Sequence, residues 1–277
     1  MFGSVQALLS ASADKPLWQA VLEDDCQDRD VPQGDSLSKM TALWETMKGS
    51  VLDYDPTRRS PCGLSGGQGA RMAALDRSIC GPFIQEVIST ALKLGEHNAC
   101  MGRIVAAPTA GACGVLPAVL IPLQRRERLT DDQMVQCLYV SAGFGQVIAT
   151  RASISGAEGG CQAEVGSASG MAAAALVHAR GGSGAQMAAA CAMALQNVLG
   201  LVCDPVAGLV EVPCVKRNVM GAVNALSCAD MALAGLSSPI PCDEVIDAMA
   251  AVGRAMPPSL RETGEGGLAA TPTGRKI

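Results

Sequence analysis

The sequence is poor in aromatic residues, in histidine and in charge. Among its 277 residues are only two Trp, two Tyr, three Phe and two His, and only 17% of residues are charged. The 26 acidic and 21 basic residues give a formal net charge of −5, which argues against nucleic acid as a partner. Because 49% of the chain is apolar, we expect it to bury an interface, as an oligomer or with a partner chain.

Also missing are a CxxC pair, a secretory leader and an apolar run fit to span a membrane. The opening MFGSVQALLSASADKPLWQA has no basic region followed by an apolar stretch, so we expect a reducing, cytoplasmic location. The uncharged stretch 104–122 contains three prolines and two glycines, which would break a spanning helix. No membrane association is expected.

The alternation of apolar and polar residues that is typical of strands is absent, whereas helical spacing recurs. Residues 36–54 carry apolar side chains at helical spacing and predict a helix capped by Ser36 or Ser38. Thr130 and Gln133 form a capping-box pattern before another helix. Further helices are expected to begin at Ser183 or Gly184 and at Asn218 or Val219. The sequence thus predicts a mainly α, all-helical fold with long glycine-rich loops, in one domain over 1–277 whose residues 1–40 are more polar.

Glycine gathers in loops. Residues 55–72 hold Gly66, Gly67 and Gly69 just before a helical run, and residues 153–170 form a second glycine-rich stretch. Such a turn before a helix can direct backbone N–H groups toward an anion, for example a carboxylate. A plain flexible loop is the alternative, although glycine-rich loops in an apolar chain are more often functional.

Cysteine is the one reactive residue type in excess, with twelve in the chain. Cys161, Cys203 and Cys214 each lie in a Gly/Pro-rich loop at a helix border, where three thiolates can hold a metal or an iron–sulfur cluster. Their separations of 42 and 11 residues match no short motif, so spacing alone leaves the site open. Others lie within apolar helical runs and are interpreted as packing: Cys80, Cys137, Cys191 and Cys228.

Three long sequence motifs support a shared cysteine site more strongly than the cysteine spacing alone. APTAGACGVLPAVL (107–120), SISGAEGGCQAEVGSASGMAAAAL (153–176) and CDPVAGLVEVPCVKRN (203–218) closely resemble the bacterial iron–sulfur L-serine dehydratases. They are similar to the α chain, or to the catalytic domain of fused forms. GLSGGQGARM (63–72) and GGLAATPTG (266–274) fit as well, so the resemblance covers most of the chain from about residue 40.

The resemblance implies a [4Fe–4S] cluster held by Cys161, Cys203 and Cys214, with a fourth iron free of protein thiolate during catalysis. Some single-chain members end in a cysteine that occupies this iron at rest, whereas this chain ends in GRKI. The implied reaction converts L-serine to pyruvate and ammonia, with the open iron as Lewis acid for the hydroxyl. The two-chain members also imply a separate β chain.

The remaining candidate site residues come from the same loops. A carboxylate beside an anionic cluster is a plausible proton acceptor, and Glu158 is preferred to Glu164, which is expected to order the loop. Lys216 can offset charge, and His97 is a further possible base. The predicted catalytic residues are therefore Glu158, Lys216 and His97. The predicted substrate-binding residues are Ser65, Gly66, Gly67, Thr109, Gly111, Ser153, Ser155 and Asn218.

Two alternatives stay open at this point. An L-cysteine desulfidase-type lyase would use the same cluster, because a thiol leaving group needs less help from a Lewis acid. A non-catalytic iron–sulfur subunit would keep the cysteines but leave the chemistry to another protein.

Overall fold

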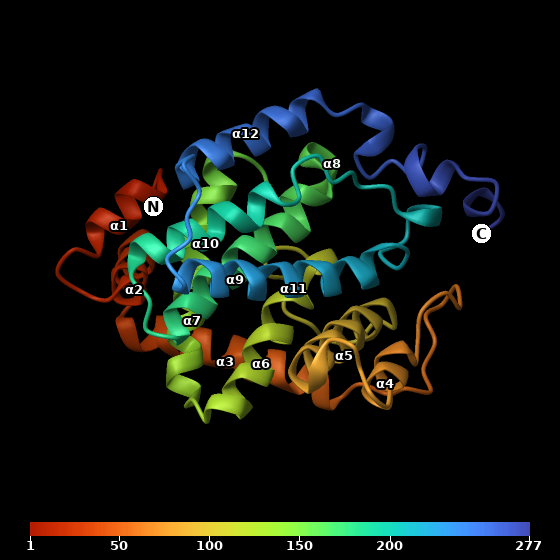
Figure 1. The fold of residues 1–277 in the computed structure, drawn as a ribbon, viewed down its shortest axis with the longest axis horizontal. Helices are drawn as coiled ribbons and strands as arrows, with labels where there is room; N and C mark the ends of the chain where they lie inside the picture. Colours follow the sequence, from red (N-terminus) through yellow and green to blue (C-terminus); the bar gives the residue numbers. More distant parts are fainter.

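The computed structural model describes residues 1–277 and confirms the mainly α prediction. Twelve α-helices are joined by loops and short turns, without a β-sheet (Figure 1). Their bounds are α1 Val5–Ala11, α2 Leu17–Arg29, α3 Gln33–Leu52, α4 Gln68–Ala73, α5 Gly81–Ala99, α6 Val115–Glu127, α7 Asp131–Arg151, α8 Gly156–Gly159, α9 Ser167–Ala179, α10 Gly184–Gln196, α11 Cys214–Leu233 and α12 Cys242–Ala255. A five-residue π-helical turn, Gln162–Gly166, leads into α9.

Helix α9 is the centre of the molecule. It packs against α7, α10, α11 and α6, and every residue from Ser167 to Val177 is buried. Its sequence SASGMAAAALVHA is built from small residues, which let four neighbouring helices approach closely. A helix without a polar face must be enclosed on all sides, so α9 is the core of the bundle.

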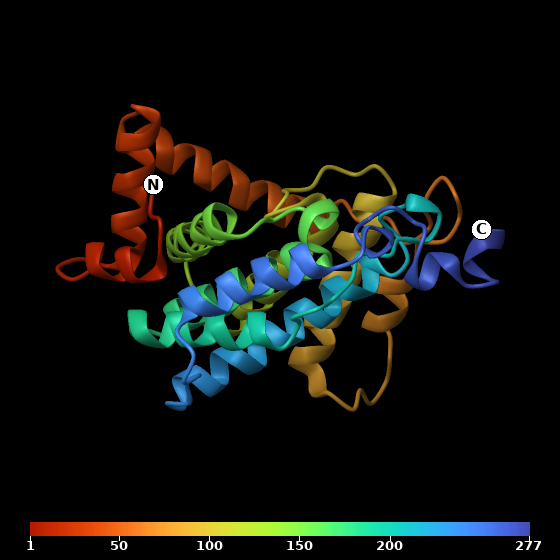
Figure 2. The same cartoon turned by 90° about the horizontal axis from the view of Figure 1, so that it is seen from above.

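The N-terminal helices pack onto this bundle, and the two termini lie at opposite ends of its long axis (Figure 2). Helices α2 and α3 lie against α7, and Val5, Leu8 and Trp44 belong to the same hydrophobic core as α9. The backbone N–H groups of Val5 and Gln6 donate to Asp243 at the start of α12, which ties α1 to the far end of the chain.

The capping box predicted at Thr130 and the helix start predicted at Ser183 or Gly184 are confirmed, and two other helix starts were wrong. Thr130 and Ser183 both form complete capping boxes at α7 and α10. Helix α3 begins at Gln33 after Pro32, and α11 begins at Cys214 after Pro213, so neither predicted serine cap nor Asn218 starts its helix. The fixed φ of proline prepares the first helical turn in both cases, a signal that apolar periodicity does not contain.

One cysteine was also misplaced by the sequence pattern. Cys80 is exposed and lies at the N-cap position, just before α5 begins at Gly81, whose φ is +73°. Cys137, Cys191 and Cys228 are buried, as the packing interpretation predicted.

Asp131 links three helices through side-chain hydrogen bonds. Part of the free energy of unfolding is therefore expected to depend on pH. The Oδ1 of Asp131 accepts from Trp44 Nε1 at 2.8 Å, Lys48 Nζ at 3.0 Å and Gln124 Nε2 at 2.8 Å. The hydrogen bonds from Gln124, Trp44 and Lys48 lower the pKa of Asp131 to about 2. Since this folded-state pKa lies below the ordinary value, the carboxylate stabilises the fold above about pH 5, and the contribution is lost as the pH falls toward 2.

Asp131→Asn is therefore expected to lower the free energy of unfolding by roughly 1 kcal/mol at pH 7, because the site is half-exposed. Urea unfolding followed by tryptophan fluorescence measures the difference, which should shrink as the pH falls from about 5 to 2. Asp132→Asn removes an equal charge from the same helical turn and is the matched control. An equal loss in both variants would assign the effect to the helix terminus instead.

No helix of this fold combines the length and apolar character needed to cross a membrane.

Candidate metal centre

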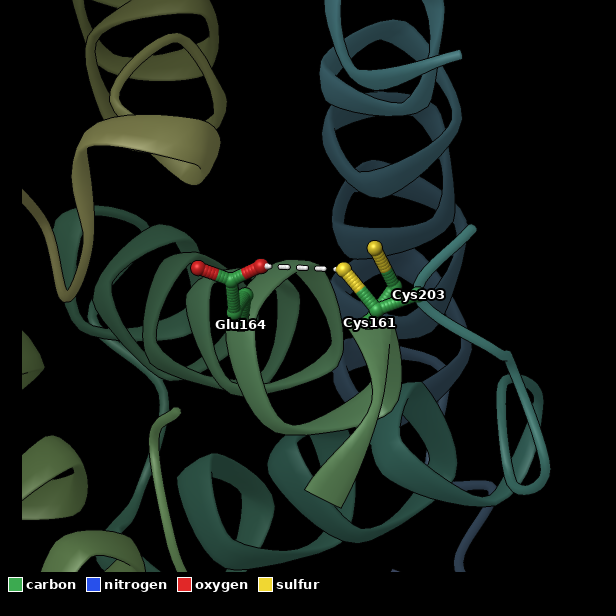
Figure 3. Close-up of side chains that lie close together, drawn as sticks. All are labelled: Cys161, Glu164 and Cys203. Atoms are coloured by element: carbon green, nitrogen blue, oxygen red, sulfur yellow. Dashed lines mark hydrogen bonds between the residues drawn. The ribbon is translucent and has the colours of Figure 1, made fainter. Parts of the chain in front are cut away.

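Two cysteine thiols from separate segments meet a carboxylate beside the turn that follows α8. The ligand atoms of Cys161, Glu164 and Cys203 all lie within 4.8 Å of one another. Figure 3 shows the three side chains pointing to the same side of the turn. Cys203 Sγ lies 3.9 Å from Glu164 Oε2, and both thiols are buried. The structure therefore brings Cys161 and Cys203, two of the three predicted cluster ligands, directly together.

Cys161 is positioned by a tight glycine turn. Gly160 ends α8 with a φ of +74°, and a Cβ on it would lie 2.8 Å from the Leu201 carbonyl oxygen. Only glycine accepts both this backbone conformation and this close approach. The chain then enters the π-helical turn Gln162–Gly166, which places Glu164 beside the thiol of Cys161.

Cys203 is held by a backbone bridge rather than by a helix. Its N–H donates to the Leu260 carbonyl at 2.8 Å, and its carbonyl accepts from Glu262 N–H at 2.8 Å. This parallel bridge, Cys203 to Arg261, anchors the loop after α10 to the C-terminal segment. The segment after α12 thus contributes to the geometry of the site.

Arg217 connects the two cysteine segments. Its Nη1 donates to Cys161 Sγ at 3.2 Å and to the Val202 carbonyl at 2.8 Å. Its Nη2 pairs with Asp204 Oδ1 at 2.8 Å, and the side chains are only 14% and 5% exposed. The other Asp204 oxygen accepts from Leu268 N–H at 2.8 Å. One buried ion pair therefore fixes the Cys161 thiol, the Cys203 loop and the C-terminal segment relative to one another.

Cys214 is buried at the first position of α11, outside the group within 4.8 Å. Burial, together with the neighbouring Cys161, raises the pKa of Cys214 to about 12. Asn218 holds this turn in place: its Nδ2 donates to the carbonyls of Gly111 and Cys214, and its Oδ1 accepts from Gly114 N–H. Because these bonds use both amide hydrogens of Asn218, the structure places it as a clamp between two motif loops.

The electrostatics of the thiol pair are asymmetric. The hydrogen bond from Cys203, and then the Arg217 guanidinium, lower the pKa of Cys161. The same hydrogen bond and burial raise the pKa of Cys203, so Cys161 gives up its proton first. Burial also raises the pKa of Glu164.

The chemistry of this donor set fits an iron–sulfur cluster. Soft thiolates are the usual ligands of such clusters, and the basic Arg217 offsets their charge. Thr109 Oγ1 is buried without a hydrogen-bond partner in the chain. A Cβ on Gly156 would lie 2.7 Å from Glu164 Oε2 and 3.1 Å from Cys203 Sγ, so the two side chains pack directly on the Gly156 backbone and only glycine fits there. The unpartnered hydroxyl of Thr109 is consistent with a group that completes the site.

The glycine-rich loop 63–69 does bind a carboxylate, but one from its own chain. Glu96 of α5 is 1% exposed and accepts from the N–H groups of Gly66, Gln68 and Gly69 at 2.8–3.0 Å. Tyr54 donates to the same carboxylate at 2.7 Å. The N–H of Gly66, predicted to hold substrate, is thus engaged by Glu96, whereas the N–H groups of Ser65 and Gly67 are not.

A second carboxylate that the sequence pattern missed fastens this loop to the Cys214 segment. Glu211 is 5% exposed and accepts from Ser60 Oγ at 2.7 Å and from Cys62 Sγ at 2.8 Å. Ser60 Oγ in turn accepts from Ser65 N–H at 3.1 Å. A charged residue inside an apolar segment, as in ALKLGEH for Glu96, is the only trace of such anchors in the sequence.

The other predicted residues lie around rather than within the thiol group. Ser153 Oγ donates to the exposed Glu158 at 2.7 Å and accepts from Ser155 N–H, which shapes the start of α8. Lys216 is exposed. His97 is buried near the end of α5, where burial lowers its pKa, and its ring packs on Gly102. Gly111 lies against Glu164, since a Cβ on it would be 3.5 Å from Oε1.

Comparison with known proteins agrees with this geometry. Residues 12–269 match the serine dehydratase alpha chain family. The chain is 49% identical to a probable L-serine dehydratase alpha chain of Bacillus subtilis, over 100% of this chain and 94% of that protein. It is 42% identical to the L-serine dehydratase alpha chain of Peptoniphilus asaccharolyticus, over 94% and 91% of the two chains.

A longer relative matches only in part. L-serine dehydratase 2 of Escherichia coli is 48% identical over 65% of this chain, which is 40% of that protein. The match to the family model and the two near-full-length relatives are decisive: the chain belongs to the serine dehydratase alpha chain family.

Proposed function

We propose that this protein is the alpha chain of an L-serine dehydratase, which converts L-serine to pyruvate and ammonia with a [4Fe–4S] cluster. The main support for this proposal is that the thiols of Cys161 and Cys203, 42 residues apart in the sequence, lie close together in a chain of this family. Cys161, Cys203 and Cys214 would hold the cluster. When bound, it would supply a Lewis acid for the serine hydroxyl, which is otherwise a poor leaving group.

The residues of the chain prepare the site for this chemistry. Arg217 holds Cys161 Sγ in place and offsets negative charge, while Asn218 fixes the Cys214 turn. The free hydroxyl of Thr109 and the hydroxyls of Ser65 and Ser155 are proposed donors to the substrate carboxylate. Because Glu96 and Glu211 hold the segment around Ser65, this donor is oriented before substrate arrives.

The reaction balances without an external reagent. Serine loses its α-proton and its hydroxyl group as water. The product is aminoacrylate, which tautomerises to an imine. The imine takes up one water and releases ammonia, so pyruvate is formed with no net change in water.

Two carboxylates are candidates for the group that accepts the α-proton. Glu158 is the sequence prediction and lies on α8 beside Ser153. Glu164 is the candidate that position favours, because it lies within 4.8 Å of the two thiols. His97 and Lys216 are the further proposed participants.

Replacing each carboxylate in turn by glutamine distinguishes Glu164 from Glu158 as the proton acceptor. Glu164→Gln is expected to lower kcat by about 10²–10⁴-fold, the usual contribution of a general base, with iron content retained. Glu158→Gln is the matched control, since it removes the same charge from the neighbouring turn, and is expected to retain most of kcat. Pyruvate formation under anaerobic conditions measures both. The reverse order of effects would assign the proton transfer to Glu158.

A separate beta chain is the proposed partner. The relatives of similar length are named alpha chains, and the matching Escherichia coli protein is longer than this chain. The low charge content of the chain, 17% of residues, is consistent with an interface of this kind.

The decisive experiment is anaerobic purification with the beta chain, followed by iron and sulfide analysis and by assay of pyruvate from L-serine. We expect about four irons per alpha chain and a change in the absorption spectrum when serine is added. Sulfide release from L-cysteine in preference to pyruvate from L-serine would favour the desulfidase. Bound iron with no turnover of either amino acid would favour the non-catalytic subunit.

A further inference from the structure

A cavity lies next to the π-helical turn, and of the candidate site residues only Ser153 and Glu158 line it. It has a volume of about 360 Å³ and lies between the start of α8, the π-helical turn and α12. This volume is in the range of small-molecule sites in proteins. Its walls do not include Cys161, Cys203 or Glu164.

Two arginines without ion-pair partners face this cavity. Arg254 of α12 and Arg261 of the C-terminal segment both line it, and neither side chain takes part in a salt bridge or hydrogen bond in the structure. The Nε of Arg261 is buried and has no hydrogen-bond partner. A buried guanidinium N–H without an acceptor costs free energy unless an acceptor is bound.

The composition of the walls defines the complementary ligand. The two guanidinium groups face one carboxylate, Glu158, which leaves a net charge of +1 at neutral pH. A single negative charge is therefore matched, whereas a phosphate dianion would be repelled by Glu158. Apolar atoms of Ala157, Ala163 and Met249 line the rest of the space and suit a short alkyl group.

The cavity is also lined by residues that hold the segments of Cys161 and Cys203 in place. Gln162 and Ala163, which directly follow Cys161, form part of its wall. Gln162 donates to the Met249 carbonyl at 3.0 Å and accepts from Gly200 N–H at 2.9 Å. Arg261 belongs to the backbone bridge that holds Cys203. A ligand here therefore contacts the segment on each side of the thiol pair.

We propose that this cavity is a binding site for a small aliphatic monocarboxylate, held through Arg254 and Arg261 next to the segments that position Cys161 and Cys203. The carboxylate accepts from the two guanidinium groups, and the alkyl group packs on the alanine and methionine side chains. Binding involves no covalent step.

Isothermal titration of the 277-residue chain with sodium butyrate, at constant ionic strength, tests this site. We expect saturable binding with one site per chain, and weaker binding of inorganic phosphate. Arg254→Gln should weaken butyrate binding at least tenfold, because one of two charged contacts is lost. Arg275→Gln removes another exposed arginine, outside the cavity, and should leave the affinity unchanged.

A second cavity variant distinguishes the loss of a binding contact from a folding defect caused by Arg254→Gln. Ala157→Asp adds a negative charge to the wall at an exposed position and should also abolish butyrate binding. Unchanged affinity in both cavity variants, equal weakening in Arg275→Gln, or tighter binding of phosphate than of butyrate would each overturn the proposal. Because no serine is turned over in this titration, failure of the proposed reaction and failure of this site give different results.

Discussion

Cys203→Ser is expected to abolish pyruvate formation from L-serine, with a loss of more than about 100-fold, since even outer-shell partners of metal ligands contribute 10–100-fold. The side chain is 2% exposed and serine is close to it in size, so the fold should persist. What is lost is the sulfur ligand atom that lies within 4.8 Å of the ligand atoms of Cys161 and Glu164. Iron and sulfide per chain, measured after anaerobic reconstitution, should fall together with activity.

Cys80→Ser provides the matched control for this experiment. Cys80 is a free, exposed cysteine at the start of α5, so its replacement should leave iron content and turnover unchanged. Normal turnover in Cys203→Ser would exclude the cysteine site as the catalytic centre and favour a scaffold role. Loss of activity in both variants would indicate a general sensitivity to the number of thiols.

Arg217→Met is expected to lower the free energy of unfolding of the metal-free chain by about 3–5 kcal/mol, the usual cost of leaving a buried charge without its partner. Asp204 is 5% exposed, and its carboxylate would lose the guanidinium 2.8 Å away. The Cys161 thiol and the Val202 carbonyl would lose donors as well. Denaturant unfolding under reducing conditions gives the difference directly.

Arg151→Met serves as the comparison, since the Arg151–Asp247 pair is 26% and 53% exposed and should contribute at most about 1 kcal/mol. The double variant Arg217→Met, Asp204→Asn should recover part of the lost stability, because no full charge is then left unpaired. Equal destabilisation by Arg151→Met and Arg217→Met would mean that burial of the inner pair adds nothing to its contribution.

The sequence was most informative where local rules apply. The predicted capping box at Thr130 depends on two side chains three residues apart and is present in the structure, and the helix predicted to begin at Ser183 or Gly184 begins there. The alanine-rich segment after residue 166 is helical because small residues favour both the helix and close packing. Each of these features depends only on residues within about one helical turn of one another.

Anion binding by the glycine-rich loop illustrates the limit of such reasoning. The pattern around Gly66 and Gly69 correctly indicates backbone N–H groups directed at a carboxylate, because glycine turns before helices favour this arrangement. The identity of the anion depends on Glu96, about 30 residues later on α5, whose place beside the loop results from helix packing.

Local periodicity, caps and long motifs thus specified an all-helical chain of this family and marked its loop cysteines. Which groups meet in space depended on contacts between distant segments. Glu164 joins Cys161 and Cys203, and Arg217 links Cys161 to Asp204, only because the packed helices and the bridge at Arg261 bring them together. Hydrogen bonds and ion pairs act over a few ångströms in space, and sequence spacing contains no measure of that distance.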